Sequence, residues 1–175
     1  MATQFCYVSF ISCKILNSLL VNYFLLDDKL EGLEASASST LFGRTKAFGP
    51  HFAVDRSSKF WNSAPSSYPW LQIKLPTTRR IIAVDVTMRK DCCADRNKDI
   101  EIRAGMNAVG NAGHEVILSD NKKVGFIPGP GILNQVYHIQ FEESVTAAYI
   151  TLQNINSDIQ IMDINEVAVY AEKGQ

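Results

Sequence analysis

The stretch Ile82-Ala83-Val84-Asp85-Val86-Thr87-Met88-Arg89 decides the fold, because apolar and polar side chains alternate along it. Successive side chains of a β-strand point to opposite faces of its sheet. One face of this strand is therefore apolar, and the other is largely polar. The apolar set is Ile82, Val84, Val86 and Met88. Arg89 is expected to leave the strand on the polar side.

Other short segments show the same strand pattern and are rich in β-branched or aromatic residues. The segment Leu71–Leu75 is expected to stop at Pro76 and to have one solvent-exposed face, which carries Gln72 and Lys74. Residues 107–131 are read as mostly loop, because Asn, Gly and Pro punctuate them. The strands are predicted at Leu71–Leu75, Asp99–Ala104, Gln135–Phe141, Ala147–Gln153 and Asn165–Ala171, with Glu115–Leu118 as a further short candidate. Short strands with turn signals and no intervening helices predict an all-β sandwich or jelly roll.

The size and charge of the chain limit its class. Its 175 residues suit one well-buried domain with a short extra segment. The 17 basic and 18 acidic residues nearly cancel, so the chain lacks the positive field that attracts nucleic acid. Nucleic acid is therefore not expected as a partner.

The N-terminal part of the chain differs from the rest. Residues 5–26 are almost entirely apolar, and the run ends abruptly at Asp27-Asp28. This pattern predicts that residues 1–28 are a leader, either a signal peptide or a signal anchor, and that residues 29–175 form the domain. The protein would then be secreted, or membrane-anchored if the leader stays uncleaved. Lys14 weakens a transmembrane reading and leaves a buried helix or strand pair as the alternative.

Polar chemistry concentrates directly after the strongest strand, in Arg89-Lys90-Asp91-Cys92-Cys93-Ala94-Asp95-Arg96. The planar fork of an arginine donates several hydrogen bonds at once, and sugar hydroxyls and ring oxygens accept them well. Asp91 and Asp95 are placed to hold the two arginine forks in orientation. A sugar also needs an apolar wall, which Phe60 and Trp61 could supply. The segment therefore predicts a sugar pocket.

The adjacent cysteines, Cys92 and Cys93, have two readings. Neighbouring Cα atoms lie about 3.8 Å apart, which is shorter than the roughly 4.4 to 6.8 Å usual for bridged cysteines. A bridge would close a tight, rigid ring that offers a fixed apolar platform. In the alternative, the cysteines are reduced and buried, and Arg89 and Arg96 form surface ion pairs with Asp91 and Asp95. A structural zinc site is not favoured, since no second pair of cysteine or histidine ligands has the required spacing.

From about Leu33 to Ala171 the chain resembles the fucolectins, or F-type lectins, within the discoidin-like, galactose-binding-like superfamily. The family pattern of Arg, one residue, Asp, an adjacent Cys pair, two residues and Arg is matched in full at residues 89–96. Further matches are Ala35 to Thr40, Ala53-Val54-Asp55, Phe60-Trp61-Asn62-Ser63, Pro69-Trp70-Leu71-Gln72-Ile73, Glu101-Ile102-Arg103-Ala104-Gly105 and Glu166-Val167. The resemblance implies a galactose-binding-like jelly-roll β-sandwich.

The resemblance also implies roles for the residues of the pocket. The two arginines would donate hydrogen bonds to a fucose-like sugar, and the cysteines would form the vicinal disulfide against which the sugar rests. An aromatic ring would meet the apolar methyl side of the sugar, and one carboxylate belongs to the same site. These ligand-binding residues are Arg89, Arg96, Cys92, Cys93, Phe60, with Trp61 beside it, and Asp91.

The family holds a structural Ca²⁺ away from the sugar, and oxygen ligands suit this hard cation. The side-chain ligands map to Asp55, Ser63 and Glu166, and the backbone carbonyl ligands to Phe52, Ser57 and Asn165. In the alternative reading, Asp55 and Glu166 are ordinary turn and edge residues. Arg56 stands where the family's calcium loop usually has glycine.

The family's third polar sugar ligand, a histidine, has no counterpart here. Between Ser63 and Trp70 the chain has residues 64–69 instead, where Ser66 or Ser67 could replace part of the hydrogen bond. Loss of a charge-strength hydrogen bond costs on the order of 1.5 to 3 kcal/mol, or about one to two decades of affinity. The sugar is therefore left open between fucose and related monosaccharides.

The predicted function is that of a lectin, not an enzyme, acting in self or non-self recognition, as in innate immunity, or in cell agglutination. Its partners would be fucosylated or related glycans, and a homo-oligomer would supply avidity, because a single pocket binds sugars weakly. A membrane would be reached only through glycans or an uncleaved leader. The alternative is a discoidin-like adhesion module that binds protein or lipid and has a degenerate sugar site. A glycoside hydrolase is not favoured, because it needs two carboxylates that face a sugar across a cleft.

Overall fold

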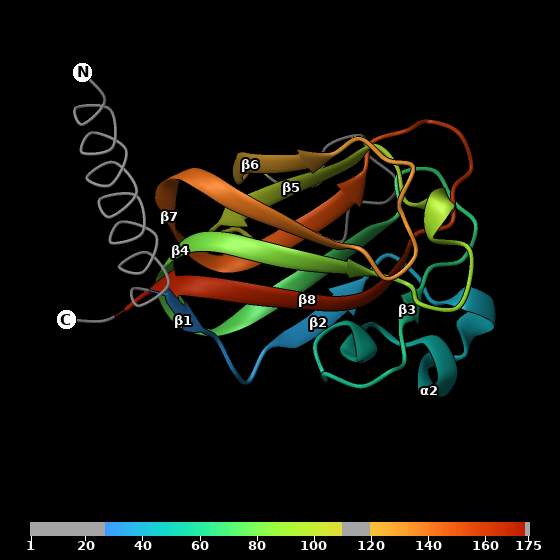
Figure 1. Ribbon diagram of the computed structural model, residues 1–175, viewed down its shortest axis with the longest axis horizontal. Helices are drawn as coiled ribbons and strands as arrows, with labels where there is room; N and C mark the ends of the chain where they lie inside the picture. The colour runs from blue at the N-terminus through green and yellow to red at the C-terminus, as the bar shows by residue number, and fades with distance from the viewer. Residues whose placement is uncertain (1–26, 110–119, 174–175) are drawn as a thin grey trace, which may run out of the picture.

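Two long strands organise the fold of the computed structural model, which describes residues 27–109 and 120–173 (Figure 1). They are β4, Trp70–Met88, and β7, Val136–Asn154, each of 19 residues. The two strands pair antiparallel in two stretches. Residues 70–74 pair with residues 149–153, and residues 79–87 pair with residues 136–147. A register shift separates the two stretches, so each strand contributes one half to each layer of a sandwich.

The remaining strands extend the two layers. In one layer, β2 lies beside β4, and β5 and then β6 lie beside β7; in the other, β8 lies beside β4 and carries β1 and β3. The predicted all-β sandwich is confirmed. The bounds of these strands are β1 Asp27–Lys29, β2 Glu34–Ala37, β3 Trp61–Asn62, β5 Ile100–Gly105, β6 Lys122–Ile127 and β8 Asp163–Glu172.

Short helices and loops gather at one end of the sandwich. Figure 1 shows that β4 ends and β8 begins near this end, whereas β8 finishes at the opposite end. The short helices are η1 Leu41–Gly43, α2 Thr45–Phe48, η2 Pro50–Ala53 and η3 Ala94–Arg96. Within the described ranges, no helix is long and apolar enough to cross a membrane.

The core lies between the two layers and uses most of the alternating set in the second half of β4. Val84, Val86 and Met88 are buried in it, as the alternation predicts. The prediction for Ile82 is wrong. A β-bulge between Ile81 and Ala83 shifts the register, so Ile81 enters the core and Ile82 stays half-buried.

The first half of β4 departs from its prediction at two points. The strand does not stop at Pro76, because this residue lies in the stretch between Lys74 and Arg79 where the ladder with β7 is interrupted. Proline lacks an N–H donor, and at Pro76 the strand has no residue pair with β7 that would need one. Gln72 does not face water. It is buried, its amide nitrogen donates to Thr151 Oγ1 at 2.9 Å, and its carbonyl oxygen accepts from the Val109 N–H at 3.1 Å.

The strand β6 was not predicted, because it falls in the segment 107–131 that is rich in turn residues. Gly125, in the middle of β6, looks like a loop residue in the sequence, but it allows β6 to pack closely against Ile139. A Cβ at this position would lie 2.3 Å from Ile139 Cγ2 of β7. The strand candidate Glu115–Leu118 and residues 1–26 of the predicted leader lie outside the described residues.

The variant Gly125→Ala tests the close approach of β6 to β7. We expect the added methyl group to lower the free energy of unfolding by about 1 to 3 kcal/mol, because it overpacks this contact. Urea denaturation measures the change. The cost should shrink when Ile139→Ala makes room in the double variant, and an equal cost in both backgrounds would show that the contact does not limit residue 125.

Candidate functional site

The segment that follows β4 forms a compact loop at the end of the sandwich. Arg89 comes directly after the strand, and the loop leads into η3. Cys92 and Cys93 are joined by a disulfide, with their Cα atoms 3.8 Å apart. Cys92 is exposed and Cys93 is half-buried, with a left-handed backbone at φ 64°. Of the two readings of the cysteine pair, the structure has the bridged one, with one side of the ring open to solvent.

Arg89 meets polar partners, and its neighbours cover it almost completely. Its side chain is only 7% exposed. Nε and Nη2 donate to Asp91 Oδ1 and Oδ2 at 2.9 and 2.7 Å, which is the bidentate geometry that a guanidinium favours. The ring of Phe60 stacks under the guanidinium, with Cζ 3.7 Å from the ring centroid. Arg89 is therefore held on two sides.

Arg96 lies near Arg89 and shares a carboxylate with it. Asp163 Oδ2, at the start of β8, lies 3.8 Å from Arg89 Nη1 and 4.0 Å from Arg96 Nη1. The side chain of Arg96 is 42% exposed, whereas that of Asp163 is fully buried. The expected role of Asp95 is therefore wrong: its side chain is exposed and makes no ion pair or hydrogen bond within the described residues, and the buried carboxylate of Asp163 faces Arg96 instead.

Asp163 and Asn97 form a buried polar pair that the sequence reading missed. Asn97 Nδ2 donates to the Asp163 carbonyl and to Oδ1 at 2.6 and 3.2 Å, and the Asp163 N–H donates to Asn97 Oδ1 at 3.0 Å. Asp163 Oδ2 has no hydrogen-bond partner among the described residues. A single aspartate within the apolar run Ile161-Met162-Asp163-Ile164 is the signal that could have found it, because a buried carboxylate needs partners.

The two carboxylates that face Arg89 have pKa values that are shifted in opposite directions from the ordinary value of an aspartate. The hydrogen bonds from Arg89 lower the pKa of Asp91 to about 2. Burial raises the pKa of Asp163 to about 6, even though Arg89, Asn97 and Arg96 favour its ionised form. The two side chains also differ in exposure: that of Asp91 is exposed to solvent, whereas that of Asp163 is fully buried and its charged form is disfavoured.

The two aromatic residues predicted to line the sugar pocket differ in their burial. Phe60 is half-buried and packs against Phe48, with ring centroids 5.8 Å apart. Trp61 does not line the pocket, because it is fully buried in the core and its Nε1 donates to the Ser39 carbonyl at 3.0 Å. The hydroxyl of Ser67 donates to the Ser157 carbonyl at 2.9 Å. A hydrogen bond from this hydroxyl to a sugar, in place of the one from the family's histidine, would therefore have to displace this bond.

The predicted calcium residues include one pair of neighbouring carboxylates. Glu166 Oε2 accepts from the Arg56 N–H at 3.0 Å, and Asp55 Oδ1 accepts from the Ser57 N–H at 2.9 Å. Burial raises the pKa of Glu166, and the charge of Asp55 raises it further. Arg56 adopts φ 60°, a conformation that glycine reaches without strain, so the backbone takes the turn without the usual residue.

The other predicted calcium residues are buried or half-buried. Ser63 is fully buried, and its Oγ accepts from the Met162 N–H at 2.9 Å. Phe52 and Asn165 are buried, and Ser57 is half-buried. No group of three or more His, Cys, Asp or Glu side chains with metal-binding geometry occurs in the ranges 27–109 and 120–173.

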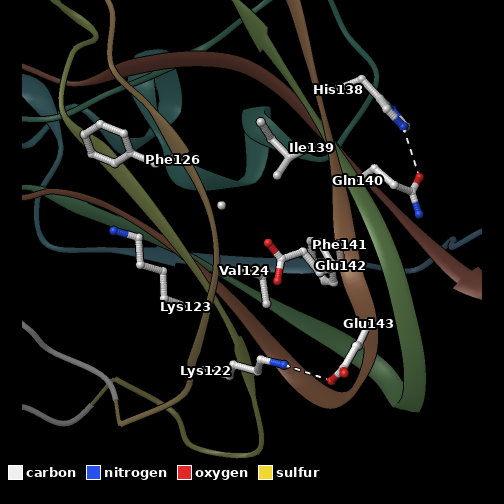
Figure 2. Close-up of a pocket in the computed structure, with 11 residues that line it drawn as sticks. Lys122, Lys123, Val124, Phe126, His138, Ile139, Gln140, Phe141, Glu142 and Glu143 are labelled. Carbon is white, nitrogen blue, oxygen red and sulfur yellow. Dashed lines mark hydrogen bonds and ion pairs between the residues drawn. The ribbon is translucent and has the colours of Figure 1, made fainter.

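A cleft of about 470 Å³ lies elsewhere, between β6 and the first half of β7. Figure 2 shows Phe126 and Glu142 on different sides of it, and the ion pair between Lys122 and Glu143, 3.4 Å apart, at one end. None of the residues predicted for the sugar or the calcium site lines this cleft. The arginine cluster and the cleft are therefore separate features of the surface.

The raised pKa of Asp163 predicts how stability changes with pH. The folded pKa lies above the unfolded one, so the folded state binds the proton more tightly, and stability falls as pH rises from about 4 through about 6. The loss amounts to as much as about 3 kcal/mol. Urea denaturation of the wild type and of Asp163→Asn in EDTA between pH 4 and 8 isolates this contribution. Parallel stability curves for the two proteins would contradict it.

Comparisons with solved structures return the same architecture from several sources. A fucolectin from striped bass (Morone saxatilis) serum is 22% identical, has a TM-score of 0.67, and is matched over 79% of this chain and 46% of its own. The family 32 carbohydrate-binding module of NanJ from Clostridium perfringens, solved with galactose, is 18% identical, with a TM-score of 0.65 over 83% and 99% of the two chains. A fucose-binding module from Streptococcus pneumoniae is 16% identical, with a TM-score of 0.60 over 79% and 91%. These likenesses establish the fold.

The sequence itself carries the family assignment. A search of curated proteins gave no match. The family model described as F5/8 type C domain matches residues 34–167, a range that includes the segment with both arginines and ends within β8 at Val167. With the sandwich topology and this match together, the chain belongs to the F5/8 type C, discoidin-like, domain family.

Proposed function

We propose that this domain is a lectin that binds fucose or a related neutral sugar without catalysing a reaction on it. The observation that carries the proposal is the grouping of Arg89, Arg96, Phe60 and the disulfide of Cys92 and Cys93 at the loop end of the sandwich. Solved relatives of this fold support it, since they include a fucolectin, a fucose-binding module, and a lectinolysin lectin domain in complex with Lewis b antigen.

The groups of the pocket would divide the work of holding a sugar. Arg96 is the more accessible donor, because almost half of its side chain is exposed. Arg89 has five N–H groups, of which two bind Asp91, so it retains donors at a fixed position. The ring closed by the disulfide offers an apolar platform. Specificity comes from the buried polar groups, which lose hydrogen bonds when a sugar lacks the matching hydroxyl.

Titration calorimetry with L-fucose tests the sugar site. Arg96→Gln is preferred to a change at Arg89, because Arg89 is buried against Phe60 and its loss would disturb packing. We expect Arg96→Gln to weaken binding by about ten- to a hundredfold, the cost of one hydrogen bond from a charged group. Arg80→Gln, which changes an exposed arginine paired with Glu172, is the control and should bind like the wild type.

The result that would overturn the lectin proposal is an array of fucosyl, galactosyl and rhamnosyl glycans on which the wild type binds nothing with calcium present. Turnover of an aryl glycoside by the purified protein would instead contradict the statement that the domain is not an enzyme.

We also propose that Asp55 and Glu166 hold a structural Ca²⁺, with Ser63 and the carbonyls of Phe52, Ser57 and Asn165 as further oxygen donors. Two neighbouring carboxylates whose charges disfavour one another fit a divalent cation, because it would neutralise both. The role of such an ion would be to fix the loop around Arg56 against β8. Ser63 Oγ already accepts a hydrogen bond from the Met162 N–H and would use its other lone pair for the ion.

Thermal unfolding in calcium and in EDTA tests the metal site. We expect calcium at about a hundredfold excess over its Kd to stabilise the wild type by about 3 kcal/mol, which raises the melting temperature by several degrees. Glu166→Gln should abolish this rise. Glu143→Gln, an exposed change at the far cleft, should keep it. Equal melting temperatures of the wild type in calcium and EDTA would argue against the site.

The setting of the domain is proposed from the sequence. Export through the leader would place the protein outside the cell, where glycan recognition or agglutination takes place, and a homo-oligomer would raise avidity. This chain matches less than half of the striped bass fucolectin, so the properties of that larger protein are carried over only as proposals.

A second candidate is an adhesion module that binds protein or lipid. Ile132 and Leu133 favour it: they are 62% and 50% exposed, and they precede Asn134, whose N–H donates to the Arg89 carbonyl at 2.8 Å. Apolar side chains beside the pocket suit contact with a surface. Binding to liposomes or a protein partner together with a blank glycan array would favour this function over the lectin.

A further inference from the structure

The strongest unexplained feature of the molecule is the buried charge beneath the arginine pocket. We propose that Asp163 is the positioning residue of the two-arginine site: it holds Arg89 and Arg96 in one common arrangement for the ligand and does not touch the ligand itself. This inference rests on the proposed sugar-binding function and concerns a residue outside the motif at residues 89–96.

The position of the carboxylate supports action through the arginines. Asp163 is fully buried, so a sugar in the pocket cannot reach it. Its Oδ2 lies 3.8 Å from Arg89 Nη1 and 4.0 Å from Arg96 Nη1, and it makes no hydrogen bond within the described residues. The atom is therefore free to act as a counter-ion for both guanidinium groups.

The two arginines differ in how much they need this counter-ion. Arg89 is already fixed by the bidentate pair with Asp91 and by the ring of Phe60. Arg96 is 42% exposed, and among the described residues the carboxylate of Asp163 is its charge partner. Without a negative charge between them, two neighbouring guanidinium groups repel each other. The carboxylate should thus matter most for the orientation of Arg96.

Asp163 is itself held rigidly, as a positioning group must be. Asn97 makes three hydrogen bonds with it, two to its carbonyl and Oδ1 and one from its N–H. Asp163 also pairs with Asn62 of β3 in the ladder with β8. Asn97 follows Arg96 directly in the chain, so the same bonds that fix Asp163 also fix the backbone next to Arg96. A rigid group beneath the pocket orients the groups that contact the ligand.

Titration of L-fucose into Asp163→Asn, in calcium, tests the proposal. This change keeps the size and the hydrogen bonds of the side chain and removes its charge. We expect the affinity to fall by at least about tenfold, as when a buried charge partner is lost. Asp95→Asn is the matched control, because it removes the same charge from an exposed carboxylate next to Arg96 that makes no ion pair or hydrogen bond within the described residues; the affinity of this variant should stay within about twofold of the wild type. Equal affinities of Asp163→Asn and the wild type would overturn the proposal.

A double-variant cycle separates positioning from a general structural effect. If Asp163 acts through Arg96, then Asp163→Asn should cost much less in the Arg96→Gln background than in the wild type. A merely structural role would weaken binding by the same factor in both backgrounds, and that additive result would also overturn the proposal.

A readout without sugar keeps this inference distinct from the lectin proposal. In ¹⁵N NMR of the ligand-free protein, the guanidinium resonances of Arg96 should report a fixed side chain in the wild type and an averaged one in Asp163→Asn. A wild type that binds no glycan but shows this difference would refute the lectin function and keep the positioning role. If Asp163→Asn does not fold, the wild-type spectrum decides alone, because an Arg96 side chain that is already averaged refutes the role of Asp163.

Discussion

The antiparallel pairing of β4 with β7 is the constraint on which the rest of the structure depends. Both strands run through both layers, so the ladder between them joins the layers and sets their relative register. The second half of β4 also pairs with β8. The end of β4 and the start of β8 are therefore brought to the same place, and Arg89 and Asp163 meet because each stands at one of these strand ends.

The resulting site is a layered arrangement of charges. The exposed carboxylate of Asp91 binds Arg89, and the buried carboxylate of Asp163 lies near both arginines. Asn97 donates a hydrogen bond to the backbone carbonyl of Asp163. Burying a carboxylate in this way opposes folding, as its raised pKa shows. The large apolar side chains of the core, among them Trp61, Ile150 and Leu152, are fully buried, and their burial offsets this cost.

The sequence predicts what depends on local pattern and misses what depends on distant partners. Val84, Val86 and Met88 are placed correctly because alternation is a local property, and residues 89–96 stand out because their types are unusual. Ile82 is misplaced because a β-bulge is set by pairing with β7 and β8, and β6 is missed because Gly125 is chosen by Ile139 across the sandwich. Asp163 is missed for the same reason: its partners lie 66 to 74 residues away and leave no spacing to read.

The length of β8 has a geometric consequence for how the domain can be mounted. Asp163 begins this strand beneath the arginines, and Glu172 ends it beside Asp27 of β1. Nine residue steps of about 3.3 Å separate the two ends by about 30 Å. Both ends of the described chain thus leave from the face opposite the arginines. A label attached at Lys173 would therefore start about 30 Å from the arginines and leave the loop end of the sandwich uncovered at the point of attachment.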